Sequence, residues 1–301
     1  MELRQLEYFV AVAEERGFTR AAERVHISQS GVSAQIRQLE RELGAELFDR
    51  SARTATLTVA GKAALEHARA ALAAAGAVGQ AVGEVTDLIR GELTVGMVIG
   101  CTVTPLFEAL ATFREAHPGV GLSLLENNSD RLVDGVRDGT ADVALVGTAA
   151  NPEGLESWTI ISERLVVAVP PDHPLAGAPV RLDDLVDHPL VCMPRGTGLR
   201  TVLDQACAAR GVRPVIALQA SAADAIADLA ARGLGVAVLS ESIAAHYSDR
   251  LTAVLIDDVE SPALLSLVWR DRKGPAVREL LVHLRKAFAR PRRSAPRRRA
   301  G

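Results

Sequence analysis

Few residues of the 301-residue chain have the types and spacing that catalysis requires. The sequence contains no Walker-type phosphate loop, no GxSxG nucleophile elbow, and no cluster of His, Cys and acidic residues with the spacing of metal ligands. The segment GLGVAV near residues 233–238 is too short for a dinucleotide fingerprint and is interpreted as a helix end leading into a strand. The sequence therefore favours a binding protein over an enzyme, and no cofactor or metal is expected.

The cysteines and histidines do not form a reactive group either. Three cysteines, an odd number, are widely spaced, which argues against a disulfide framework and fits a reducing cytoplasm.

The first residues carry charges every few positions and contain no apolar signal core, and no apolar run is long enough to cross a bilayer. We expect a cytoplasmic protein associated with the nucleoid and not with membranes.

Positive charge is concentrated at the C-terminal end. Residues 285–301 contain eight Lys or Arg and no acidic residue, which leaves 26 basic and 37 acidic groups in the rest of the chain, a balance of −11. We expect a disordered Arg-rich tail over residues 291–301. Two interpretations remain open: the tail adds non-specific affinity for phosphates through counterion release, or it is a solvated tail without a dedicated partner.

The first sixty residues predict short helices and a hairpin. Apolar residues recur at helical spacing over residues 3–13, 18–25 and 28–43. Ser28 is a suitable N-cap for the third helix and Gly44 a suitable C-terminal stop. The following segment, LFDRSARTATLT, predicts a short hairpin or wing. Two helices joined by a short turn, the second amphipathic, have the geometry that lets a helix enter the major groove of DNA.

The rest of the chain predicts a long helix and an α/β domain. The Ala-rich stretch 60–89 contains no proline and predicts one long helix. From Gly91 onward, apolar strands alternate with helices, which is typical of mostly parallel sheets covered on both faces. ERLVVAVP near 163–170 and ALLSLVWR near 263–270 lie about where the chain could cross between two lobes. Because ligands bind outside the carboxyl ends of strands in such sheets, two lobes imply a binding cleft.

Residues 3–61 resemble the LysR-type transcriptional regulators in the order of their features. These are an LxYF opening, FTRAA, SQSGVSAQIRQLE, LG, LFDR and LTxAG. The resemblance continues to about residue 290, where the α/β region is similar to the family's periplasmic-binding-protein-like (type 2) sensor domain. It implies a winged helix-turn-helix over residues 1–59, a linker and dimerisation helix over 60–89, and an effector-binding domain over 90–290. Lobe 1 would comprise about 90–162 and 267–290, and lobe 2 about 163–266.

The resemblance also implies which residues contact DNA. The helix from Ser28 to Leu43 would be the recognition helix, in a homodimer or homotetramer on a pseudo-palindromic double-stranded site. Gln and Arg read adenine and guanine edges, whereas Ser more often contacts phosphate. Ser30 stands where the family usually has proline. The implied DNA-binding residues are Gln29, Ser30, Ser33 and Arg37, with Arg53 from the wing.

The family's effector position falls on strand ends and helix starts of the two lobes. Backbone N–H groups at helix starts, together with hydroxyl groups and one Arg, favour a small anionic effector such as a carboxylate. For each Ser or Thr, an ordinary helix-capping role is the alternative. The implied effector-binding residues are Gly100, Cys101, Thr102, Ser129, Thr148, Arg195 and Thr197.

Four alternatives to this interpretation can be weighed from the sequence. Peroxide-sensing members of the family use a cysteine pair, and Cys207 falls near one of those positions, but Gly198 stands where the reactive partner is expected. An enzyme would need one of the motifs that the chain lacks. A solute-binding protein would need an export signal and no helix-turn-helix, and a purely architectural DNA-binding protein leaves the two-lobed domain unexplained. The sequence therefore predicts a DNA-binding regulator controlled by a small molecule.

Overall fold

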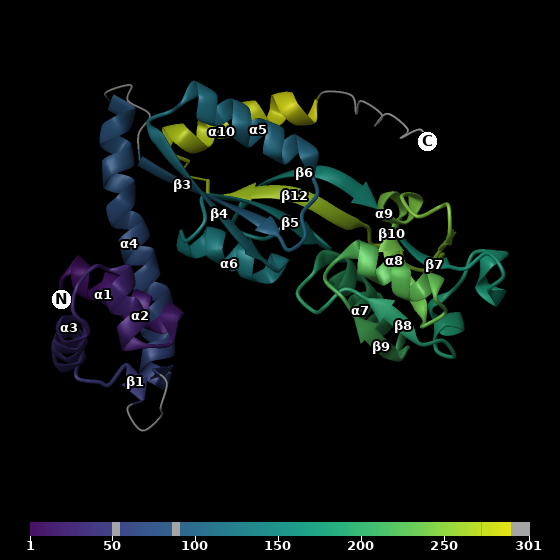
Figure 1. Ribbon diagram of the computed structural model, residues 1–301, viewed down its shortest axis with the longest axis horizontal. Coiled ribbons are helices and arrows are strands. Elements are labelled where there is room, and N and C mark those ends of the chain that lie inside the picture. Colours follow the sequence, from purple (N-terminus) through teal and green to yellow (C-terminus); the bar gives the residue numbers. More distant parts are fainter. Residues whose placement is uncertain (50–54, 86–90, 272, 290–301) are drawn as a thin grey trace, which may run out of the picture. The chain divides into compact units, whose positions relative to one another are not determined.

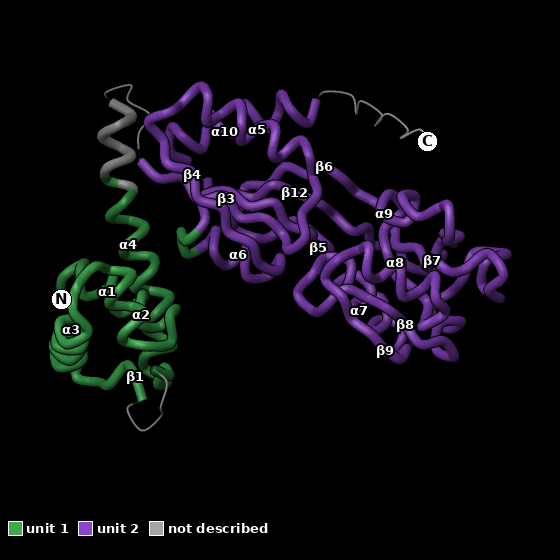
Figure 2. Tube along the Cα trace, viewed as in Figure 1, with its two compact units in different colours: residues 1–88, 138–140 green, residues 89–137, 141–301 purple. Residues whose placement is uncertain are grey.

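The computed structural model describes residues 1–49, 55–85, 91–271 and 273–289. The chain forms two compact units, residues 1–88 with 138–140 and residues 89–137 with 141–301 (Figure 2). Arg53, the end of the predicted linker helix and the predicted tail lie outside the described residues. None of the described helices combines the length and apolar character that a bilayer crossing requires.

The first unit contains the predicted helices and wing. Ser28 caps the third helix, because its Oγ accepts a hydrogen bond from the Gly31 N–H at 3.1 Å. Gly44 ends the same helix in the left-handed conformation with φ +69°. These features confirm the predicted start and stop of that helix. The elements are α1 (Leu3–Glu15), α2 (Phe18–Arg24), α3 (Gln29–Leu43), β1 (Phe48–Asp49), β2 (Thr56–Leu57) and α4 (Val59–Val85) (Figure 1).

The core of this unit is a small aromatic and aliphatic cluster. The rings of Phe9 and Phe18 meet the Phe48 ring edge-on, with centroids 5.5 and 5.6 Å away. The apolar face of α3 closes the cluster with residues such as Val32 and Ile36, which are almost fully buried. Because Phe48 belongs to β1, the cluster joins the wing to α1 and α2.

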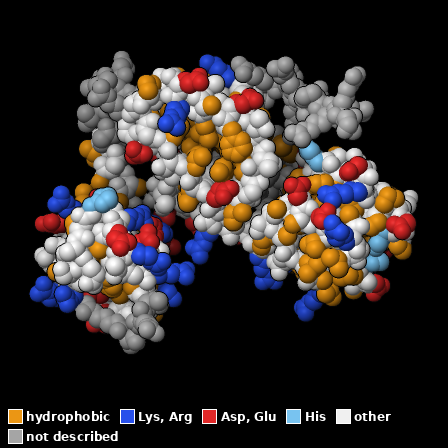
Figure 3. Space-filling view, viewed as in Figure 1, with side chains coloured by type: hydrophobic (Ala, Val, Ile, Leu, Met, Phe, Trp, Pro, Cys, Tyr) orange, Lys and Arg blue, Asp and Glu red, His pale blue; other side chains and the backbone are white. Residues whose placement is uncertain are grey.

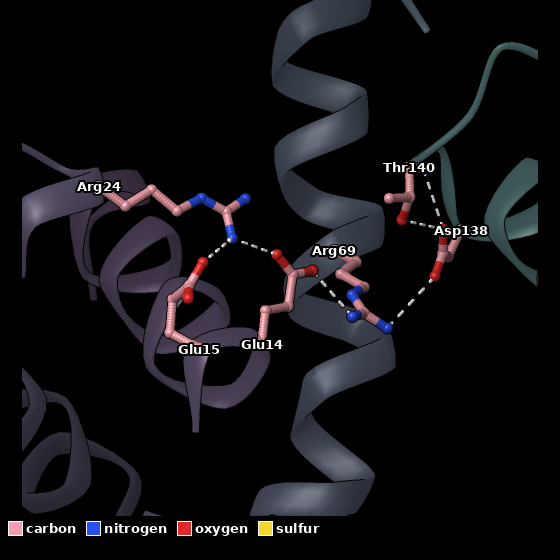
Figure 4. Close-up of polar contacts among 6 residues, drawn as sticks. All are labelled: Glu14, Glu15, Arg24, Arg69, Asp138 and Thr140. Carbon is pink, nitrogen blue, oxygen red and sulfur yellow. Dashed lines mark hydrogen bonds and ion pairs between the residues drawn. The ribbon is translucent and has the colours of Figure 1, made fainter. Parts of the chain in front are cut away.

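Ion pairs connect α4 with the rest of the first unit (Figure 4). The Glu14 carboxylate accepts from Arg24 at 2.6 Å and from Arg69 on α4 at 2.9 Å. Arg69 also lies 3.6 Å from a carboxylate oxygen of Asp138, whose other oxygen accepts from the Thr140 N–H. Half-exposed ion pairs contribute little to stability one at a time, so the network mainly sets the orientation of α1 against α4.

Lobe 1 of the second unit is a mixed five-stranded sheet with helices on both faces. Alternate residues of β5 point to opposite faces: Val143 and Leu145 pack against α5 and α10, whereas Ala144 and Val146 pack against α6. The strand order is β4-β3-β5-β12-β6, with β4, β3 and β5 parallel and the other two antiparallel. The elements are β3 (Gly91–Val98), α5 (Thr104–Ala116), β4 (Val120–Asn127), α6 (Ser129–Asp138), β5 (Val143–Thr148), β6 (Glu156–Glu163), β12 (Ala263–Trp269) and α10 (Pro275–Phe288).

Lobe 2 repeats this design with a second five-stranded sheet. Helix α7 covers one face and α8 the other, and the strand order is β11-β7-β10-β8-β9. Strands β10, β8 and β9 are parallel, and β7 and β11 are antiparallel to their neighbours. The elements are β7 (Leu165–Val169), short 3-10 turns η1 (Pro174–Ala176) and η2 (Leu182–Leu185), β8 (Leu190–Cys192), α7 (Gly198–Arg210), β9 (Ile216–Gln219), α8 (Ala223–Ala231), β10 (Val236–Ser240), α9 (Glu241–Ala245) and β11 (Thr252–Leu255).

The chain passes between the lobes along antiparallel strands. Strand β6 ends in lobe 1 at Glu163 and β7 begins in lobe 2 at Leu165, which is where the sequence predicts a crossing. The chain returns to lobe 1 at β12, which begins at Ala263, within the segment 263–270 where the sequence predicts the second crossing. These crossing strands are why each sheet contains a parallel group of only three strands.

Candidate functional site

The structure describes four of the predicted DNA contacts, all of them on α3. Gln29, Ser30 and Arg37 are exposed and Ser33 is half-buried, whereas Val32 and Ile36 of the same helix are buried. The Gln29 amide donates to Ser33 Oγ at 3.0 Å, and Ser30 Oγ lies 3.1 Å from Ser28 Oγ. These groups can exchange their local hydrogen bonds for bonds to a base edge or a phosphate.

A buried carboxylate that the sequence analysis missed connects α3 to the wing. Glu40 is 6% exposed, and its Oε1 accepts from the backbone N–H groups of Leu47 and Phe48 at 2.9 and 3.3 Å. Removing this acceptor would leave two buried donors without a partner. The sequence alone does not single out Glu40 as buried, since it stands among several other acidic residues.

The two lobes meet at strand ends and helix starts. The Ser129 N–H at the start of α6 donates across the lobes to the Gly196 carbonyl at 2.9 Å. The Ser129 hydroxyl accepts from the Gly147 N–H at 3.0 Å, and its side chain is 2% exposed. Ser129 therefore holds the loop after β4, the end of β5 and the loop before α7 together.

Two glycines allow a close backbone approach at the same place. A Cβ added to Gly198, the first residue of α7, would lie 2.3 Å from the Gly147 carbonyl carbon and 2.6 Å from the Thr148 nitrogen. Such distances do not occur for real side chains, so only glycine fits here. The start of α7 thus lies directly against the carboxyl end of β5.

Thr148, the last residue of β5, has an unsatisfied polar group at this junction. Its hydroxyl oxygen is buried and has no hydrogen-bond partner among the described residues. A buried hydroxyl without a partner is unfavourable by roughly 1–3 kcal/mol in protein mutational data. A ligand that reached this hydroxyl would supply the missing hydrogen bond.

The other predicted effector residues have different surroundings. Gly100 has φ +71°, and a Cβ there would lie 3.8 Å from the Ser221 carbonyl of lobe 2, so the loop after β3 faces the region before α8. Cys101 is half-buried and Thr102 is exposed. The Thr197 hydroxyl donates to the Pro194 carbonyl at 2.8 Å. The Arg195 side chain is 84% exposed and lies 4.0 Å from Asp204 of its own lobe.

Two polar residues that sequence reasoning missed also lie near this junction. Asn128 lies close to Gly196, where an added Cβ would be 2.8 Å from the Asn128 amide nitrogen, and its Oδ1 caps α6 by accepting from the Arg131 N–H at 3.0 Å. Arg200 is 6% exposed and donates to Asp204 at 2.8 Å and to Gln219 at 3.2 Å. Asn128 is a polar residue between a strand and a helix, and this position in the sequence could have identified it as a candidate site residue.

The cysteine thiols are not activated. Burial raises the pKa of Cys192 to about 12 and that of Cys207 to about 11. Burial also raises the pKa of the Cys101 thiol. Because the thiolate is the reactive form, these surroundings oppose peroxide chemistry at neutral pH. The described residues also contain no group of three or more His, Cys, Asp or Glu side chains that could hold a metal ion.

Family models match both parts of the chain. Residues 3–62 match the bacterial regulatory helix-turn-helix protein of the lysR family, and residues 86–289 match the LysR substrate binding domain. The "Uncharacterized HTH-type transcriptional regulator YnfL" of Escherichia coli is 34% identical over 294 residues, covering 96% of this chain and 99% of that protein. A "Probable hydrogen peroxide-inducible genes activator" of Mycobacterium avium is 36% identical over 239 residues, covering 79% and 77% of the two chains.

A solved structure agrees with these matches. The structure of full-length CbnR complexed with its target DNA is 29% identical, with a TM-score of 0.58, and the match covers 95% of this chain and all of that one. The two family models together cover the described residues other than 1–2 and 63–85, which are the first two residues and most of α4. The chain belongs to the LysR-type transcriptional regulators, and it is a DNA-binding transcription regulator with an effector-binding domain, not an enzyme.

Proposed function

We propose that this regulator binds a pseudo-palindromic DNA site and that a small anionic molecule held between its two lobes changes that binding. The observation that carries the proposal is the buried, unpartnered Thr148 hydroxyl at the junction of β5 and α7. The regulator would act on the nucleoid in the cytoplasm. Its division into residues 1–59, 60–89, 90–290 and 291–301 is part of the same proposal.

On the DNA side, α3 reads bases and the wing contacts the backbone. Gln29 and Arg37 have side chains suited to adenine and guanine edges, and Ser30 and Ser33 suit phosphate contacts that fix the register. The exposure of Gln29, Ser30 and Arg37 and the partial exposure of Ser33 support the assignment. Arg53 in the wing is assigned to the backbone or the minor groove on sequence grounds.

On the effector side, the ligand would contact residues of both lobes. We assign Gly100, Cys101, Thr102, Ser129 and Thr148 of lobe 1 to this site, with Arg195 and Thr197 of lobe 2. Thr148 would supply a hydroxyl, whereas Ser129 would mainly position the loops, since its hydroxyl already accepts a hydrogen bond. The starts of α6 and α7 supply backbone N–H groups, which favour an anion. Arg195 would have to turn away from Asp204 to reach it.

Coupling between effector and DNA follows from the close approach of the lobes. A Cβ at Gly198 would overlap the Gly147 carbonyl group, so a ligand placed between these two backbones would change how far the lobes close. A ligand shifts such an equilibrium only by its difference in affinity for the two arrangements. Lobe closure would then alter contacts between protomers and the spacing of their α3 helices.

The exposed surface of α4 supports self-association. Ala63, Ala70, Ala74 and Val78 are exposed and follow a helical repeat, and Val78 is 65% exposed. Exposed apolar stripes of small side chains allow two helices to approach closely. Hydrophobic side chains also gather on the visible face of each lobe (Figure 3). We assign a homodimer or homotetramer on this basis.

The test of DNA recognition is selection from random or genomic fragments at moderate salt, followed by sequencing of the bound fraction. The wild-type protein is expected to select an inverted repeat that Arg37→Ala no longer enriches. Arg4→Ala is the matched control, because Arg4 is an exposed arginine of α1. The nearby Met1 amino group contacts Glu42, near the end of α3, which lies about 20 Å along the helix from its start at Gln29. Arg4 is therefore expected to lie away from the residues of α3 that read DNA. If Arg37→Ala selects the same repeat with the same affinity, the assignment of α3 is wrong.

A further inference from the structure

We propose that the hydrogen bond from the Ser129 N–H to the Gly196 carbonyl works as a latch between the two lobes, and that opening this latch changes DNA binding. The latch rests on the proposed function, in which movement of the lobes is coupled to the helix-turn-helix. It concerns the regulation of the effector site and not the identity of the effector.

The N–H groups at the start of α6 have acceptors within the protein. A helix cannot satisfy the N–H groups of its first turn by itself. In α6, Asn128 accepts two of them, from Arg131 through its Oδ1 and from Leu132 through its carbonyl, both at 3.0 Å. The Ser129 N–H donates to the Gly196 carbonyl at 2.9 Å. A carbonyl of lobe 2 therefore takes a donor that an anionic ligand could otherwise use, and opening the latch frees this donor.

Only one of the two hydrogen bonds of Ser129 described above depends on lobe 2. The Ser129 hydroxyl accepts from the Gly147 N–H at 3.0 Å, and both residues belong to lobe 1. Separation of the lobes therefore breaks the bond to Gly196 and leaves the bond to Gly147 in place. One net hydrogen bond shifts an equilibrium roughly 2- to 13-fold. A bond of this strength favours the closed arrangement and still lets it open.

The turn that carries Gly196 is adapted to this contact. Gly196 has φ +84°, a conformation that favours glycine, and an added Cβ would lie 2.8 Å from the Asn128 amide nitrogen and 3.2 Å from a carboxylate oxygen of Asp130. The Thr197 hydroxyl donates to the Pro194 carbonyl at 2.8 Å, which closes the turn within lobe 2. The turn therefore keeps its own hydrogen bond when the bond from Gly196 to lobe 1 breaks.

Two substitutions of Ser129 separate its two hydrogen bonds. Ser129→Pro removes both the N–H and the hydroxyl, whereas Ser129→Ala removes only the hydroxyl. Ser129 is the first residue of α6, a position where proline fits because its missing N–H has no acceptor inside the helix. The difference between the two variants therefore measures the latch.

Limited trypsin digestion followed by mass spectrometry detects opening of the latch without any effector. Trypsin cuts after Arg195, whose side chain is largely exposed and which directly precedes Gly196. The bond between Arg232 and Gly233 is the internal reference, because Gly233 also has a positive φ, +75°, and has open space around its Cβ position. Relative to this reference, we expect Ser129→Pro to be cut at Arg195 roughly 2 to 13 times faster than Ser129→Ala, since cleavage follows the population of the open form.

The same two variants test whether the latch acts on DNA binding. With no carboxylate present, their Kd values for the selected operator should differ by at least about twofold. Equal cutting ratios at Arg195 would overturn the proposal, and so would faster cutting with an unchanged Kd. Failure of the proposed function looks different, because then no carboxylate stabilises the wild type, whatever the two variants do.

A measurement on the wild type covers the case in which Ser129→Pro does not fold and trypsin cuts both bonds quickly. Hydrogen exchange at single-residue resolution compares the Ser129 N–H with the Leu132 N–H, whose acceptor lies in the same lobe. We expect the Ser129 N–H to exchange faster, because it loses its acceptor each time the latch opens. Equal or slower exchange at Ser129 would overturn the proposal.

Discussion

Replacing Thr148 by valine tests the effector site in the absence of any effector. Valine keeps the branched shape of threonine and exchanges the hydroxyl for a methyl group, so the packing at the end of β5 is preserved. Because the Thr148 hydroxyl is buried and has no partner among the described residues, its removal relieves a desolvation penalty. We expect Thr148→Val to raise the free energy of unfolding by about 1 kcal/mol, within the 1–3 kcal/mol range for such groups.

The matched control is Thr159→Val on β6 in the same lobe. The Thr159 hydroxyl is 3.3 Å from Asn151 Oδ1 and 3.2 Å from the Ser266 hydroxyl, so the same substitution removes existing hydrogen bonds. We expect this variant to lose about 0.5–1.5 kcal/mol. Urea unfolding followed by circular dichroism measures both variants against the wild type, and the two changes should have opposite signs.

The same two variants also test whether the Thr148 hydroxyl binds a carboxylate ligand. A panel of small carboxylates is screened by thermal shift, and the acid that raises the Tm of the wild type most is titrated into each variant. Loss of one buried hydrogen bond should weaken its binding to Thr148→Val roughly 5- to 150-fold. Thr159→Val should bind it normally. If Thr148→Val is destabilised by more than 1 kcal/mol, the hydroxyl is already hydrogen-bonded in the protein and the reasoning is refuted.

Three further predictions concern other parts of the structure. Glu40→Ala should destabilise the first unit by about 1–3 kcal/mol in urea unfolding, because the Leu47 and Phe48 N–H groups lose their acceptor. Glu40→Gln keeps an acceptor oxygen and should lose less stability. An equal loss of stability in the two variants would contradict this explanation. Gly198→Ala should lower the free energy of unfolding by about 1–3 kcal/mol, because the added Cβ would overlap the Gly147 backbone. Gly177→Ala, which has open space around it, should change stability little. If the two variants had the same melting curves, the close approach of Gly147 and Gly198 would be wrong. Burial and the neighbouring His117 lower the pKa of His283 below its ordinary 6.5, so the unfolded chain binds more protons and stability should fall as the pH drops below 6.5. In urea titrations from pH 7.5 to 5, His283→Gln should flatten this loss, and an unchanged pH profile would show that His283 does not contribute.

Local sequence signals were sufficient to predict the helix-turn-helix. Ser28 and Gly44 mark the ends of α3 by their own chemistry, and the apolar spacing of Val32 and Ile36 defines its buried face. The lobes were also predictable, because buried strands such as β5 and β10 are continuous apolar runs. Strand β6 was harder to find, since ESWTIISE is only half-buried along its length.

The site itself depends on contacts that sequence spacing does not encode. The close approach of Gly147 and Gly198 joins residues from different lobes, and nothing in either local sequence indicates the other. The same holds for Glu40, whose importance comes from the wing N–H groups folded onto it. Arg195, in contrast, was assigned from its position before a helix, although its side chain is exposed beside Asp204.

The central claim is that one chain couples an effector between its lobes to DNA binding by α3. The most direct test is to measure the Kd for the selected operator with and without the carboxylate identified by thermal shift, together with the footprint on the operator. We predict a change in Kd of at least fivefold or a shift in the protected half-sites, with the reciprocal change in carboxylate affinity when operator is present. A carboxylate that stabilises the protein but alters neither the Kd nor the footprint would contradict the account.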